Sequence, residues 1–402
     1  MGKYTALDNP RVDEMIAGHL NQIVEAVAER VSFQAIIFYG SVARGEASVM
    51  VDDDQIIMLS DYELSVVGRS PRLRGVLAEL SRQMTERLGV DTGINWMRPS
   101  RLRTNHTKNL AFGQAAPSIF MYELKSAGYV LSGEDVLRSC PPIDPADIPL
   151  TSGIAMVLNR MAEALAYLPC SHKRHPHLDA LMWINKIVLA CADALLLSAR
   201  RYHYSYQERG RRFAAADEFL APLIPQAPAM PRLVERAVEF KLRPRLDLYP
   251  DELDAVWADV AAMADVVYRH LMKQQYEEDW GTYAEFPAQH LALLAGRKRR
   301  RSLPKRAISM ARQKLVESVK YLDQKRRWPP VFRTLHSPSE VVYTLVPVLF
   351  QSCFSQNQKP MLHETRRWLT LLGTLDPTST DVLTEWNHLR QHLIWNWKEF
   401  CY

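Results

Sequence analysis

The sequence has few cysteines and no obvious segment for export. Its five cysteines, in 402 residues, include no C-x-x-C pair, and an odd count does not suit a fully paired disulfide framework. The first residues, MGKYTALDNPRVDEM, lack the apolar core of a signal peptide. Position 6 is alanine, so the serine or threonine of a myristoylation signal is missing too. We therefore expect a reducing, cytoplasmic location.

The chain also lacks a strong charge, a repeat and an evident membrane span. The formal net charge is +5, from 50 basic and 45 acidic residues, which is too mild by itself to indicate a nucleic-acid partner. No repeat of fixed period appears. No uninterrupted apolar run approaches the length of a membrane span, so none is expected. The length is enough for two or three domains with their own cores.

What the chain does contain is concentrated in residues 38–64, FYGSVARGEASVMVDDDQIIMLSDYEL. The β-branched and aromatic run 33–39 predicts a buried strand, and Gly40-Ser41 ends it. Backbone N–H groups freed by such a turn can hold phosphate oxygens. The segment 49–59 predicts an added hairpin whose turn is at residues 52–54. The turn at Gly40-Ser41 is therefore a candidate phosphate site.

Two carboxylates with alternate spacing follow this turn. Asp61 and Glu63 flank Tyr62 and lead into the apolar run LSVV. On a strand with a period of two, both acidic side chains point to the same face. Like charges at this spacing repel each other, and a divalent cation is the usual reason to keep both ionised. The pair predicts a magnesium site, although an ordinary hairpin with surface acids has the same spacing.

At these residues the chain resembles the DNA polymerase beta-like nucleotidyltransferase superfamily, whose signature is a strand, a Gly-Ser turn, and Asp-x-Asp/Glu on the next strand. The matching residues are Gly40, Ser41, Asp61 and Glu63, with Arg44 in the Arg-Gly after the turn. The chain departs from compact members in the twenty positions between Ser41 and Asp61. The resemblance implies ATP or another nucleoside triphosphate as donor, held with two Mg²⁺ ions, and the turn and Arg44 as the grip on its phosphates.

The same resemblance implies a third carboxylate on a neighbouring strand. Residues 72–88 have the apolar period of a helix, and Asp91 opens a short alternating segment after it. Asp91 is the candidate third catalytic and metal-binding carboxylate, with Asn95 as the fallback. Residues 117–137 resemble the helix and strand that close the family's catalytic domain.

Beyond residue 140 the pattern becomes almost wholly helical. We expect an α/β, or α+β, nucleotidyltransferase head with a small mixed sheet at 1–140, a helical domain completing the cleft at 150–295, and a basic linker with a C-terminal helical domain at 296–402. Seven of the ten residues 297–306 are basic, which fits a solvated linker, or a surface for RNA, membrane or another polyanion.

One helical segment, 177–200, carries two charges in an apolar surround. Lys186 and Asp193 lie seven positions apart, on one side of a helix. In several branches of the family a lysine of the helical domain reaches the triphosphate, which implies that role for Lys186; a buried or bridged ion pair is the structural alternative. Tyr202, Tyr206 and Arg209 follow, as an acceptor pocket or as interdomain packing.

The sequence predicts a metal-dependent enzyme that transfers a nucleoside monophosphate, AMP from ATP in the simplest case, and releases pyrophosphate. The acceptor stays open among a small molecule, a sugar phosphate and a protein; nucleic acid is possible but not favoured. The alternative is a weakly active regulatory or antitoxin-type protein that acts through its helical regions.

Overall fold

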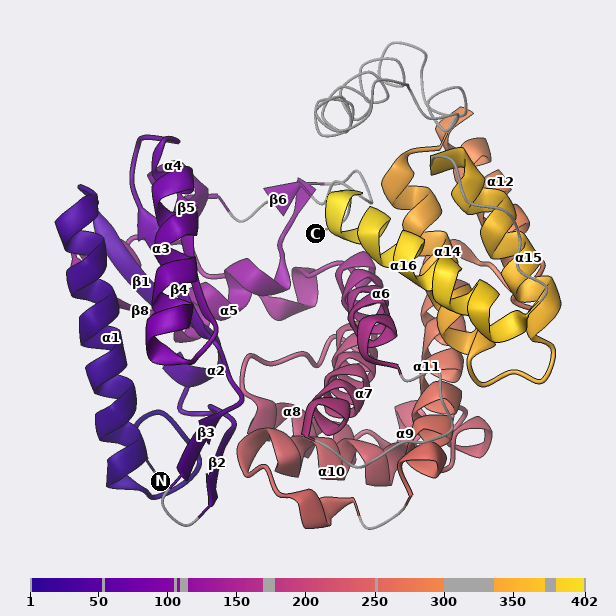
Figure 1. Ribbon diagram of the computed structural model, residues 1–402, viewed down its shortest axis with the longest axis horizontal. Helices are drawn as coiled ribbons and strands as arrows, with labels where there is room; N and C mark the ends of the chain where they lie inside the picture. Colours follow the sequence, from indigo (N-terminus) through magenta and orange to yellow (C-terminus); the bar gives the residue numbers. More distant parts are fainter. Residues whose placement is uncertain are drawn as a thin grey trace.

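The computed structural model of the protein describes residues 2–52, 55–104, 107–108, 115–168, 178–249, 252–299, 336–372 and 381–400. A head with a small mixed sheet lies on one side, and a larger body of helices lies on the other (Figure 1). This arrangement confirms the predicted small mixed sheet followed by an all-helical region. The turn residues 53 and 54 lie outside the described residues, as does the part 300–335 of the predicted basic linker and C-terminal helical domain.

The head is built on a four-stranded sheet of order β5-β4-β1-β8. Strand β4 runs antiparallel to β1 and parallel to β5, and β8 is antiparallel to β1. The bounds are β1 Ala35–Tyr39, β4 Tyr62–Val67, β5 Thr92–Met97 and β8 Tyr129–Gly133. The parallel pair needs a crossover connection, which helix α3, Leu73–Leu88, supplies. Mixed pairing of this kind places the ends of β1, β4 and β5 close to one another.

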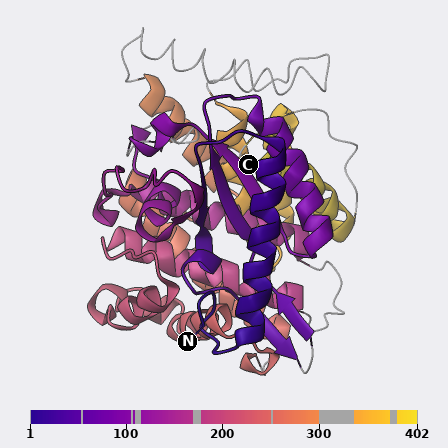
Figure 2. The same ribbon diagram turned by 90° about the vertical axis from the view of Figure 1, so that its left-hand side faces the viewer.

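Helices cover both faces of the sheet. Helix α1, Pro10–Arg30, lies along one face with α3 (Figure 2), and their apolar sides enclose a core with Ile36, Phe38 and Leu64. On the other face, Met121 and Leu124 of α5, Ile119–Ala127, pack on Ile37 and Val67. Alternation along the strands explains this division, since successive residues point to opposite faces.

The predicted insertion between the turn and the acid pair is a hairpin, as expected. Strands β2, Val49–Asp52, and β3, Gln55–Met58, are antiparallel and form a sheet of their own. Shorter described elements of the head are α2 Gly40–Ala43, α4 Pro99–Leu102, β6 Thr107–Lys108 and β7 Ala115–Ala116. The hairpin and α2 lie at the end of the head opposite to α4 (Figure 1).

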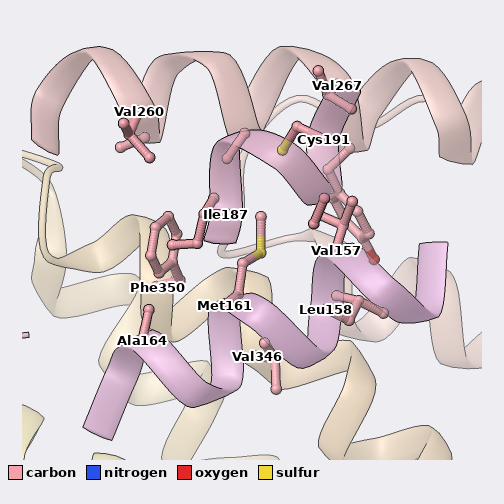
Figure 3. Packing of buried hydrophobic residues seen from close by; sticks show 14 of the residues in the cluster. Val157, Leu158, Met161, Ala164, Ile187, Cys191, Val260, Val267, Val346 and Phe350 are labelled. Carbon is pink, nitrogen blue, oxygen red and sulfur yellow. The ribbon is translucent and has the colours of Figure 1, made fainter. Parts of the chain in front are cut away.

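The helical body has one continuous apolar core. Helices α6, α7, α11 and α14 meet there through side chains such as Met161, Ile187, Val260 and Phe350 (Figure 3). Helices from both predicted helical regions therefore share this core. Their bounds are α6 Leu150–Tyr167, α7 Leu178–Ser198, α8 Tyr206–Ala214, α9 Asp217–Leu220, α10 Met230–Leu242, α11 Leu253–Tyr276, α12 Phe286–Arg299, α14 Pro338–Ser352, α15 Gln358–Leu369 and α16 Val382–Phe400.

Within α7, the segment Ala180–Ser198 is long and apolar enough to cross a membrane by length and composition, although Lys186 and Asp193 interrupt its apolar run. In the structure 72% of the tested window is buried, and residues such as Ile184, Val188 and Leu195 belong to the helical core. The core helix of a soluble protein can have the same length and apolar composition. This single segment is therefore weak evidence for a membrane span, and the structure is compatible with the absence of one.

Candidate functional site

The glycine of the predicted turn is held directly against the second acid. Gly40 follows β1 with φ of +81°, in the left-handed region that favours glycine. A Cβ atom at this position would lie 1.9 Å from Oε2 of Glu63. No other residue fits without moving the carboxylate. The structure therefore brings Gly40 and Glu63 together, as the resemblance implies.

The two predicted carboxylates lie at the start of β4. Glu63 pairs with Tyr39 across the antiparallel ladder, while Asp61 just precedes the strand and is exposed. Burial, together with the charges of Asp61 and Glu123, raises the pKa of Glu63 to about 7, and the charges of Arg44 and Lys241 oppose this rise. Among the described residues, no side chain or backbone group forms a hydrogen bond or ion pair with either carboxylate of the pair. Two acids are thus held close together without a protein counter-ion in direct contact.

A lysine that the sequence reasoning missed faces this pair from the helical body. The Nζ atom of Lys241, in the last turn of α10, donates to Oγ of Ser60 at 3.1 Å. Burial lowers the pKa of Lys241 to about 8, and the charge of Asp61 opposes this shift. The surrounding sequence, VEFKL, is an ordinary amphipathic helix end and carries no signal of a site.

Lys186 of α7 faces the head as well. Its ammonium group lies 4.3 Å from the centre of the Trp183 ring. Burial lowers the pKa of Lys186, the charge of Arg160 lowers it further, and the charges of Asp61 and Asp91 act in the opposite direction. These interactions place Lys186 within electrostatic reach of two of the predicted acids. Its helix neighbour Asp193 instead pairs with Arg209, so the two charges of α7 have different partners.

The third predicted acid does not complete a metal cluster. Asp91 is exposed and precedes β5, where its backbone carbonyl accepts a hydrogen bond of 2.8 Å from the N–H of Tyr62. In the described part of the chain, no three His, Cys, Asp or Glu side chains lie close enough to hold a metal ion. Asp91 therefore does not form such a group with Asp61 and Glu63 here, and its role as third carboxylate stays a prediction. The parallel register is the reason: it places Gly93, which has no side chain, beside Glu63.

The fallback residue, Asn95, lies farther along β5, beside Ser65 of β4. Its side chain interacts with the hydroxyl of Tyr39, whose pKa is raised to about 12 by burial and by the charge of Glu63. Asn95 therefore lines the same face of the sheet as Glu63 and contacts the tyrosine next to it. It is positioned to order Tyr39 instead of replacing a carboxylate.

The hydroxyl of Ser41 is buried beside the turn. It donates to Oγ of Ser60 at 3.2 Å, and the same Ser60 oxygen accepts the backbone N–H of Ser48 at 2.9 Å. Together with the bond from Lys241, these contacts make Ser60 the junction of the turn, the hairpin and α10. Ser41 is thus at the site, but its hydroxyl already has a partner.

Arg44 is engaged within the protein. Its side chain is 3% exposed and pairs with Glu46 at 3.3 Å and with Glu123 of α5 at 3.0 Å. The predicted role of this guanidinium, a direct grip on phosphate, would require breaking buried ion pairs. From its observed position, Arg44 acts on the site through its charge, which favours the ionised form of Glu63.

A buried network, which sequence reasoning missed, joins the turn to the helical body. Glu46 accepts hydrogen bonds from the Ser205 hydroxyl at 2.7 Å and from the backbone N–H groups of Tyr206 and Gln207 at 3.0 and 3.1 Å. It therefore caps the start of α8 across the interface. Since Glu46 directly follows Arg44-Gly45, the segment after the turn is fixed to the helical body.

The other half of the network is centred on α5 and α8. Glu123 accepts a hydrogen bond of 2.6 Å from the Tyr202 hydroxyl and lies 3.6 Å from Arg209, which also pairs with Asp193. The guanidinium of Arg209 is stacked 3.8 Å from the centre of the Tyr206 ring. Of the two readings of the segment after α7, interdomain packing is the one that these contacts support.

The acid pair has the chemistry to supply carboxylate oxygens to a Mg²⁺ ion. Magnesium takes oxygen ligands, and a site commonly supplies one or two carboxylates while water and substrate phosphate provide the rest. Glu63 is held in a position where burial and a neighbouring acid penalise its charge, which a bound cation would relieve. Asp61 and Glu63 are the residues that would hold it.

Comparisons with protein-family models, curated proteins and solved structures found no match.

Proposed function

We propose that the protein is a nucleotidyltransferase that transfers a nucleoside monophosphate, in the simplest case AMP from ATP, to an acceptor and releases pyrophosphate. The observation that carries the proposal is the Gly40 turn held against Glu63, with Asp61 beside it and two lysines facing the pair. A close backbone turn, acidic oxygens and cations in one place are what binding a metal-bound triphosphate requires.

The phosphates would be bound by groups from both halves of the molecule. The positive-φ turn at Gly40 would offer backbone N–H groups to a phosphate beside the Glu63 carboxylate, with Mg²⁺ between the two negative groups. Lys186 and Lys241 would neutralise the outer phosphates from the helical side. When bound, Mg²⁺ would stabilise charge that develops on the reacting phosphoryl group and favour the ionised acceptor hydroxyl. Asp61 and Glu63 would hold that ion.

An exposed acid at the same edge of the sheet, Asp91, would remove the proton from the acceptor. Asp91 is exposed, and Lys186 is within electrostatic reach of both Asp91 and Asp61. In this proposal Asp91 accepts the acceptor's proton, with or without contact to a second Mg²⁺ ion. The acceptor class, whether small molecule, sugar phosphate or protein, is not specified by this arrangement. The cysteine pattern leads us to place the enzyme in the cytoplasm.

A second function is favoured by one observation. Since the described residues contain no three-acid cluster that could hold a metal ion, a nucleotide-binding regulator with weak or no transfer activity is the alternative. Such a protein would bind ATP at the same turn and act through its helical body.

The discriminating experiment is incubation of the purified protein with α-labelled ATP, Mg²⁺ and a cell extract, followed by identification of labelled products. Transfer is supported if the parent chain labels an acceptor and the Asp61→Asn variant leaves the same acceptor unlabelled. ATP binding without any labelled acceptor, under conditions where pyrophosphate release is also undetectable, would support the regulator.

A further inference from the structure

A cluster of exposed arginines lies at the end of the head opposite to the candidate site. Two segments that follow the parallel strands, 68–74 after β4 and 97–104 after β5, contain six arginines and no acidic residue. Strand β4 separates the cluster from Glu63 by roughly 20 Å, from the rise per residue of a strand. We call this cluster the arginine face; its members are Arg69, Arg72, Arg74, Arg98, Arg101 and Arg103, all exposed.

The two segments form one continuous surface. The N–H of Gly68 donates to the carbonyl of Met97 at 3.0 Å, and Nε1 of Trp96 donates to the carbonyl of Gly68 at 2.9 Å. The guanidinium groups of Arg74 and Arg98 lie 4.6 and 5.4 Å from the centre of the Trp96 ring. Trp96 therefore gathers arginines from both segments at one place.

The members of the arginine face lack the counter-ions that several exposed arginines elsewhere in the chain have, although exposed arginines without an ion pair to a described residue, such as Arg30 and Arg87, also occur singly. Arg82, Arg211 and Arg232, for example, each pair with an acidic side chain. Among the described residues, none forms an ion pair or hydrogen bond with the side chain of any member of the arginine face. Six cations close together without compensation repel one another, so an anionic partner would be bound favourably.

The aromatic contacts indicate which anion is suited to this face. A guanidinium stacked on a ring keeps its N–H donors directed along its own plane, where they can make paired bonds to phosphate. Arg101 adds a third such contact, 5.6 Å from the centre of the Phe120 ring. Clustered arginines beside aromatic rings are typical of surfaces that bind single-stranded nucleic acid through its phosphates and bases.

We propose that the arginine face binds single-stranded nucleic acid. Binding here does not depend on the proposed nucleotidyl transfer, because the face lies at the other end of the sheet and its test uses no nucleoside triphosphate. The partner is recognised by its phosphodiester backbone, so little sequence preference and a strong dependence on salt are expected.

The test is anisotropy of a labelled single-stranded RNA oligonucleotide of mixed sequence, titrated with the full chain at several salt concentrations. The patch variant carries Arg74→Gln, Arg98→Gln and Arg101→Gln. The matched control carries Arg82→Gln, Arg232→Gln and Arg367→Gln, which removes the same charge from arginines that have acidic partners. Both variants must show the circular dichroism spectrum and melting temperature of the parent chain.

We expect at least a tenfold loss of affinity in the patch variant and less than a twofold loss in the control. The slope of log affinity against log salt should also fall by about 2 in the patch variant, from about 0.7 for each of three phosphate contacts. Equal losses of RNA affinity in the two variants would show that the net charge of the protein, and not the arginine face, determines binding, and would overturn the proposal. It would also be overturned if polyglutamate or phosphatidylserine vesicles competed as well as unlabelled RNA at equal charge, since the face would then select neither phosphodiester nor base.

Discussion

Removing the charge of Glu63 should stabilise the protein above neutral pH, with a magnitude that follows from its pKa. The folded-state pKa is raised from 4.5 to about 7, so the folded protein holds this proton more tightly than the unfolded chain. Its favourable contribution is complete below the unfolded pKa and is lost as pH rises through the folded value. A difference of this size corresponds to about 3 kcal/mol as an upper limit, from about 1.4 kcal/mol per pKa unit.

The assay is urea unfolding of the parent chain and the Glu63→Gln variant near pH 5 and near pH 8. The difference between their unfolding free energies should change by about 1–3 kcal/mol in favour of the variant between these two conditions. Other titrating groups cancel in this difference. Glu25→Gln, on the exposed side of α1, is the control and should show no such change.

Magnesium provides the second arm of the same experiment. If Asp61 and Glu63 hold the ion, adding Mg²⁺ near pH 8 should raise the melting temperature of the parent chain more than that of Glu63→Gln. A pH-independent difference between the two chains would refute the reasoning about burial and charge. An equal response to Mg²⁺ would refute the metal assignment alone, because the pH effect does not depend on it.

Further predictions concern the lysines, the turn and the buried network. Lys186→Ala and Lys241→Ala should each weaken ATP binding by about 1–3 kcal/mol in isothermal titration; unchanged affinity would assign that lysine to structure. Gly40→Ala should abolish transfer and lower the unfolding free energy by about 1–3 kcal/mol, because its Cβ would collide with the facing carboxylate; near-normal activity would contradict this. Arg209→Met should cost about 3–5 kcal/mol by leaving Asp193 buried without its partner, and adding Asp193→Asn should recover part of that loss.

The parts of the fold with strong local patterns could be predicted from the sequence. The helix expected at 72–88 occurs at Leu73–Leu88, and the C-terminal helical domain expected within 296–402 includes helix α14 at Pro338–Ser352. Both have a regular apolar period, and the second also has a complete capping box at Ser337. The strand before the turn was predictable for a similar reason, since five consecutive buried residues make an unbroken apolar run.

The site was predictable only where it depends on neighbouring residues in the sequence. Gly40 directly follows Tyr39, which pairs with Glu63, so a single antiparallel register determines that Gly40 and Glu63 meet. The position of Asp91 depends instead on the register of β5, a parallel strand that follows a helix. A shift of β5 by two residues relative to β4 would place Asp91, in place of Gly93, beside Glu63. Lys241 reaches the site from α10, about 180 residues farther along the chain, where no local pattern distinguishes it from a surface lysine.

The network around Glu46 bears on how the two halves of the site are positioned. If Lys186 and Lys241 are to meet a phosphate held at Gly40, the helical body must be fixed relative to the turn to within the length of a hydrogen bond. Glu46 provides such a constraint because it lies six residues after Gly40 and accepts two backbone N–H groups of α8, while Arg44 between them is bound to α5 through Glu123. A hinge between head and body would have to break these buried contacts, each with a desolvation penalty. The contacts therefore favour a site whose two sides are preorganised, with substrate entering a fixed arrangement of charges instead of assembling it.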